Sequence, residues 1–160
     1  MKAASLKDIQ TELENLSTGD VLALCLRLAR FKKENKELLT YLLFEAFDEP
    51  AYVSILKKEM EEQFADINTS SLYFVKKSLR KILRTTAKHT RYTGSPVVEA
   101  QLLLHFCTTL KASGIPVSDS PVLVNLYGQQ VKKIRKAVST LHEDLQYDFL
   151  KELEPLSAPG

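Results

Sequence analysis

Hydrophobic residues recur at intervals of three and four positions along most of this chain, which places them on one face of a helix. Glycine and proline fall almost entirely between such stretches, beside polar residues that favour helix ends. The spacing is not the alternation that half-buried strands require. The pattern therefore predicts an all-α protein of six or seven helices, arranged as a bundle or as a short α-solenoid-like stack of helical hairpins.

The predicted helices differ in how much apolar surface they carry. The stretch 36–47 is apolar nearly all round, so we expect it to be central in the fold, with Asn35 as its N-cap. The other stretches carry a single apolar face and a polar one. The helices are expected over residues 5–16, 20–31, 36–47, 49–67, 71–92, 96–112 and 120–153.

The last of these helices is unusually long. At 1.5 Å per residue it would measure ~50 Å, more than the ~30 Å width of a domain of this size. We therefore expect it to lie along a stack of helices or to protrude towards a partner, with Gly128 as the one candidate for a break. Its apolar positions form a heptad seam that could join two copies as a homodimer. The seam is Val124, Tyr127, Val131, Ile134, Val138, Leu141 and Leu145.

Composition limits the class of protein. The chain has 160 residues, of which 44% are hydrophobic and 26% charged, as in a globular domain with its own core. We expect one helical domain over residues 1–153 and a flexible tail over 154–160. No secretory leader and no membrane-length apolar run is recognisable, which favours the cytoplasm and argues against a membrane. Cys25 and Cys107 lie in apolar helical patterns and are expected to be buried free thiols.

The net charge of +2 conceals a strong asymmetry. Residues 1–70 hold nine basic and 13 acidic side chains, residues 71–136 hold 12 and two, and residues 137–160 hold one and five. The middle block either faces the acidic helix over 51–67, so that the charges cancel, or leaves a positive surface for a partner. Its candidate binding residues are Lys76, Lys77, Arg80, Lys81, Arg84, Lys88, Arg91, Lys132, Lys133, Arg135 and Lys136.

Motifs for catalysis or cofactor binding are missing. There is no glycine-rich phosphate loop, and the histidines and cysteines lack metal-ligand spacing, so neither a cofactor nor a metal is expected. Glu45 lies within the apolar stretch 36–47 and is expected to pair with Arg80 or Arg84, because a buried carboxylate needs a partner. His105 shares a polar stripe with Gln101 and Thr108.

Three functions fit this pattern. The leading hypothesis is a non-enzymatic interaction or adaptor protein, whose basic surface at residues 76–91 and 132–136 binds an acidic protein. The first alternative is a nucleic-acid-binding protein that contacts the phosphate backbone. Aromatic residues interleave with the basic block, a spacing more typical of a core than of base stacking: Tyr73, Phe74, Tyr92 and Tyr127. The second alternative is an enzyme with a polar site between helices, formed by Glu45 and His105.

Overall fold

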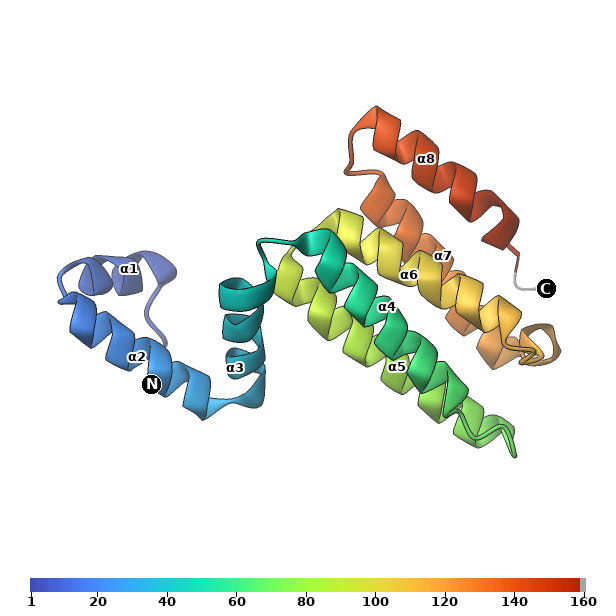
Figure 1. Ribbon diagram of the computed structural model, residues 1–160, viewed down its shortest axis with the longest axis horizontal. Coiled ribbons are helices and arrows are strands. Elements are labelled where there is room, and N and C mark those ends of the chain that lie inside the picture. The colour runs from blue at the N-terminus through green and yellow to red at the C-terminus, as the bar shows by residue number, and fades with distance from the viewer. Residues whose placement is uncertain (159–160) are drawn as a thin grey trace. The chain divides into compact units, whose positions relative to one another are not determined.

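The computed structural model describes residues 1–158, and these residues contain eight α-helices and no strand (Figure 1). The all-α prediction is therefore confirmed, with eight helices instead of six or seven. One π-turn (Tyr41–Glu45) and two 3₁₀ turns (Val117–Asp119, Glu154–Leu156) complete the secondary structure. The helices are α1 (Leu6–Glu14), α2 (Thr18–Phe31), α3 (Lys33–Thr40), α4 (Glu49–Ala65), α5 (Leu72–Thr93), α6 (Pro96–Ala112), α7 (Pro121–Val138) and α8 (Glu143–Leu153).

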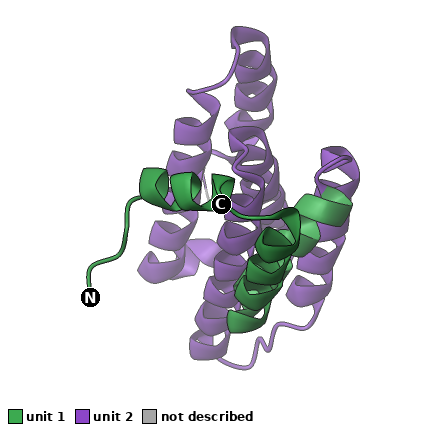
Figure 2. Cartoon of the chain, turned by 90° about the vertical axis from the view of Figure 1, so that its left-hand side faces the viewer, with its two compact units in different colours: residues 1–45 green, residues 46–160 purple. Residues whose placement is uncertain are grey.

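The chain divides into two compact units, Met1–Glu45 and Ala46–Gly160, shown in different colours in Figure 2. The first holds α1, α2, α3 and the π-turn, and the second holds α4 to α8. That residues 1–153 act as one domain stays a prediction.

Helix α6 lies at the centre of the second unit and packs against α4, α5, α7 and α8. It carries only two charged residues other than histidine, Glu99 and Lys111, and eight of its side chains are buried. The prediction that the stretch 36–47 is central is wrong, because Tyr41 is its one buried residue and Phe44 and Phe47 are exposed. An apolar stretch becomes buried only where other helices surround it, and the first unit has few helices to do so.

Capping residues at the helix starts account for most of the predicted boundaries. The side chain of Asp48 accepts a hydrogen bond from the backbone N–H of Ala51, with Pro50 in the first turn of α4. Ser95 and Ser120 cap α6 and α7 in the same way, each followed by a proline. Asn35 is an exception, since it lies inside α3 and its Nδ2 donates to the carbonyl of Leu28, 2.8 Å away.

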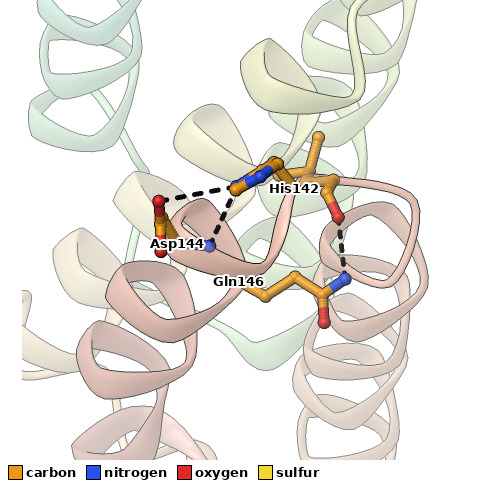
Figure 3. Close-up of polar contacts among 4 residues, drawn as sticks. His142, Asp144 and Gln146 are labelled. Carbon is orange, nitrogen blue, oxygen red and sulfur yellow. Dashed lines mark hydrogen bonds and ion pairs between the residues drawn. The ribbon is translucent and has the colours of Figure 1, made fainter.

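The predicted long last helix is broken between Val138 and Glu143. Hydroxyl groups of Ser139 and Thr140 donate to carbonyls of the last turn of α7, at 2.6 and 2.7 Å, and so compete with continuation of the helix. His142 then caps α8 by accepting from the N–H of Asp144, and Nε2 of Gln146 donates to the carbonyl of Leu141 at 2.8 Å (Figure 3). The heptad spacing of apolar residues continues through the break between α7 and α8, so periodicity alone did not reveal the break. At Gly128, where we expected any break, α7 is continuous.

Most of the heptad seam is used inside the second unit. Tyr127, Val131, Ile134 and Val138 are buried, and α7 packs mainly against α6. Only Leu145, on α8, is well exposed among the seam residues. The buried part of the seam is therefore not available to a second copy, and a homodimer joined through it has no support.

Three side chains donate hydrogen bonds to the segment 154–158, which is part of the predicted tail; the flexibility of that tail stays a prediction. Nζ of Lys111 donates to the carbonyls of Pro155 (2.8 Å) and Ala158 (3.1 Å). The hydroxyl of Tyr127 donates to the carbonyl of Leu156 (2.6 Å). A guanidinium nitrogen of Arg135 donates to Ser157 (3.3 Å). Residues 159–160 of the predicted tail lie outside the described residues.

The two cysteines differ in accessibility, contrary to the expectation that both are buried. Cys107 is fully buried, and burial raises the pKa of its thiol to about 12. The pKa of Tyr127, its hydrogen-bond partner, is also raised by burial to about 12. Cys25 is exposed on α2.

These environments predict that one thiol per folded chain reacts quickly. Cys25 should be alkylated by iodoacetamide at pH 8, whereas Cys107 should react only after unfolding, since the thiolate is the nucleophile. Mass spectrometry of the native and the urea-unfolded protein gives the number of labels. Two fast labels on the native protein would contradict the buried position of Cys107.

Candidate functional site

The basic residues of α5 occupy the side of the helix away from the core. Val75, Leu79, Ile82 and Thr86 are buried, as their spacing predicts. At 100° per residue, the stripe that begins at Lys77 lies on the opposite side of the helix. Its members at 77, 81, 84 and 91 are exposed and Lys88 is half-buried. Beside the stripe, Arg80 is exposed and Lys76 is half-buried.

Three members of this stripe, Lys77, Lys81 and Arg84, are not neutralised by ion pairs with the acidic residues of α4. Within residues 46–158, no carboxylate comes within 4 Å of the cationic groups of Lys77, Lys81 or Arg84. Helix α5 itself carries no acidic residue. On α4, Glu61 lies next to His105 of α6. The other acidic residues of the segment 59–66 are exposed. The positive charge of α5 is therefore open to solvent at these three positions.

The second basic cluster lies near the end of α7. Its four members, residues 132, 133, 135 and 136, are exposed, and only Arg135 has a described hydrogen-bond partner, Ser157. Helices α5 and α7 run in the same direction in Figure 1. Their first turns lie together, because Leu72 and Val75 of α5 and Leu123 of α7 line one cleft of about 370 Å³.

Two aromatic residues at the start of α5 are exposed. Tyr73 is 64% and Phe74 42% exposed, and their rings meet edge to face with centroids 5.5 Å apart. The interpretation of these two as core residues is wrong. The interpretation as a core residue is right for Tyr127, which is buried. Tyr92 is half-buried.

A separate polar cleft of about 340 Å³ surrounds His105. The predicted stripe of Gln101, His105 and Thr108 lines it, together with Lys57 of α4 and with Asp148 and Glu152 of α8. Sequence reasoning missed the charged residues of the facing helices. The i,i+4 spacing of Asp148 and Glu152 signals a shared face on α8, but it does not show which helix that face meets.

His105 is held close to a carboxylate but is partly withdrawn from water. Its Nε2 lies 2.9 Å from Oε1 of Glu61 without the alignment of a good hydrogen bond, so the contact is mainly electrostatic. Burial lowers the pKa of His105 below its usual value, and nearby Lys57 adds to this effect, while Glu61 opposes it. The neutral imidazole is therefore favoured in the folded state.

This lowered pKa predicts how pH affects stability. A histidine whose pKa is lower in the folded than in the unfolded state stabilises the protein above about pH 6.5, and this contribution is lost as pH falls through the folded-state pKa. The charged neighbours on the facing helices are Lys57 and Glu61 of α4 and Asp148 and Glu152 of α8. We expect His105→Gln to cost more stability at pH 7.5 than at pH 5, as measured by the melting temperature at each pH. A larger cost at pH 5 would mean that the charged pair with Glu61 dominates.

The residues that line the cleft around His105 all belong to the second unit and do not include Glu45. It is half-buried at the end of the π-turn and belongs to the first unit. Its pairing with Arg80 or Arg84, and a site shared with His105, therefore stay predictions.

Comparison of the chain with protein-family models, with curated proteins and with solved structures found no match. Over residues 1–158, no helix has both the length and the apolar character needed to cross a bilayer. The same residues contain no cluster of three or more histidine, cysteine or carboxylate side chains suited to a metal ion.

Proposed function

We propose that this chain is a non-enzymatic interaction protein, whose basic surface receives an acidic segment of another protein. The basic surface consists of the candidate residues at 76–91 on α5 and at 132–136 on α7. The observation that supports the proposal is the exposure of Lys77, Lys81 and Arg84 on a helix without an acidic residue and without a carboxylate of the second unit in ion-pair range.

The electrostatic reason is the regular repetition of the charges. Residues 77, 81, 84, 88 and 91 follow one line along α5, and 14 residues of helix extend over ~21 Å. Neighbouring charges in this line are closer together than the Debye length of ~8 Å at physiological salt. An acidic segment laid along the helix therefore meets several positive charges at once, and such complementarity accelerates association and selects for acidic partners.

Titration with defined polyanions tests the proposal. A fluorescein-labelled poly-glutamate peptide is titrated with the full chain at 50 mM and 200 mM NaCl and followed by anisotropy. We expect saturable binding that weakens at the higher salt concentration. No binding of the peptide at 50 mM NaCl would reject the basic surface as a site for acidic proteins.

A nucleic acid is the second candidate partner, and the exposed rings of Tyr73 and Phe74 at one end of the basic stripe favour it. Aromatic side chains on an electropositive surface can stack with unpaired bases. A labelled 20-nucleotide single strand, titrated in parallel, separates the two candidates. Tighter binding of the single strand than of poly-glutamate, weakened by Tyr73→Ala and Phe74→Ala, would favour the nucleic acid.

A further inference from the structure

The first turn of α5 exposes three consecutive apolar residues. Leu72 is 47%, Tyr73 64% and Phe74 42% exposed. Single exposed apolar side chains are ordinary on protein surfaces, but a run of three is avoided unless it serves a function. The next apolar residues of the helix, Val75 and Leu79, are buried. The start of α5 is therefore a candidate contact surface.

Tyr73 and Phe74 lie on the same side of α5 as the basic stripe. At 100° per residue they lie ~40° and ~60° to either side of Lys77, whereas the buried Leu79 lies ~160° away. The other members of the stripe lie within ~40° of Lys77. Tyr73 precedes Lys77 by one turn, which is ~6 Å along the helix axis. The two rings therefore continue the basic stripe towards the start of α5.

The packing of the two rings on each other favours an apolar side chain as their ligand. The planes of Tyr73 and Phe74 make an angle of 73°, with centroids 5.5 Å apart. Bases stack face to face on aromatic rings, so two steeply inclined rings do not both stack with a pair of parallel, neighbouring bases. An aliphatic or aromatic side chain instead contacts the face of one ring and the edge of the other.

The whole face calls for a partner segment with an apolar end and an acidic body. Burial of an apolar side chain against the rings is favourable by ~25 cal/mol per Å² of surface removed from water. From Lys77 onwards the exposed charges are positive, and α5 has no acidic residue that would repel a carboxylate. From Tyr73 to Arg91 the face is ~27 Å long, which about eight residues of an extended chain span.

We propose that the partner of the basic surface is an acidic segment with one or two apolar residues at one end, which pack against Tyr73 and Phe74. This rests on the proposed function and extends it from the charge of the partner to its register. Charges repeated at regular intervals let an acidic segment shift along α5, because each register makes similar contacts. An apolar contact at one end of the stripe fixes where the segment begins. Aromatic side chains are frequent among the residues that dominate binding at interfaces.

Three fluorescein-labelled peptides test this surface. One is a chain of ten glutamates, and the other two carry a pair of added leucines at the N-terminal or at the C-terminal end. Each is titrated with the full chain at 50 mM NaCl and followed by anisotropy. We expect at least one of the leucine-bearing peptides to bind about fivefold more tightly than the plain peptide. Equal affinities of the three peptides would overturn the proposal.

Removal of the two rings should abolish this gain. The variant Tyr73→Ala with Phe74→Ala should bind the leucine-bearing and the plain peptides equally, with the affinity for the plain peptide within about twofold of that of the unaltered chain. The matched control is Tyr147→Ala with Leu150→Ala, which removes two exposed apolar side chains from α8 and should keep the gain. A gain that survives removal of the rings, or that the control also loses, would overturn the proposal.

The outcomes separate a missing apolar contact from a missing basic site. No binding of the plain peptide would reject the proposed function, whereas binding without a gain from leucine would reject only the contact with the rings. The labelled 20-nucleotide single strand is titrated with the same variants. If removal of Tyr73 and Phe74 weakens binding of the single strand more than binding of the leucine-bearing peptides, the rings contact bases and the proposal is overturned.

Discussion

Replacement of Phe106 by alanine should lower the free energy of unfolding of the second unit by ~3–5 kcal/mol. Phe106 lies in the middle of α6 and is 0% exposed, and its ring packs against that of Phe64 on α4 with centroids 5.4 Å apart. The truncated side chain would lose its burial and leave a cavity that helices on several sides of α6 cannot all close.

Urea denaturation followed by circular dichroism measures this loss. Phe74→Ala is the matched control, because it removes the same side chain from an exposed position on α5. We expect the control to change the free energy of unfolding by less than ~1 kcal/mol. Equal effects of the two substitutions would mean that α6 is not the centre of the core.

Reversal of three charges on α5 should weaken binding of poly-glutamate about 100-fold at 50 mM NaCl, equivalent to ~2.7 kcal/mol. The variant carries Lys77→Glu, Lys81→Glu and Arg84→Glu. It removes three of the five cationic groups of the stripe and replaces them with groups that repel the peptide. All three side chains are exposed, so the fold should be unaffected.

The matched control is the triple variant Lys2→Glu, Lys58→Glu and Lys151→Glu. It alters the net charge by the same amount at exposed positions outside the basic surface. Anisotropy titrations should show less than a threefold change for this control. Equal weakening by both triple variants would mean that net charge, and not the face of α5, attracts the peptide. A further weakening by Lys132→Glu and Lys136→Glu would assign the α7 cluster to the same surface.

The helical class and most helix boundaries could be predicted because they depend on local interactions. Periodicity identifies one face of a helix, and caps such as Asp48 and Ser95 act within a single turn. The buried face of α5, with Val75 and Leu79, followed from the same spacing. The break after Val138 was missed because the side chains that cause it, such as Thr140, act through hydrogen bonds that leave the apolar spacing unchanged.

The candidate sites, too, could be predicted only in part from the sequence. The basic stripe was visible in the sequence, since residues on one helix keep a constant angular relation. The surroundings of His105 were not visible, because Lys57 and Asp148 come from helices 48 and 43 positions away. The spacing within one helix does not specify the rotation of its neighbours.

Local chemistry thus accounts for the all-α class, for the caps and for the position of the positive charges along the chain. Packing between distant segments accounts for the central place of α6, for the burial of Cys107 and for the exposure of Cys25. The physical reason is that periodicity reports how apolar a helix face is, whereas burial depends on which other surfaces meet that face. The stretch 36–47 is more apolar all round than most of the chain, yet most of it is exposed, because the first unit offers it few surfaces to pack against.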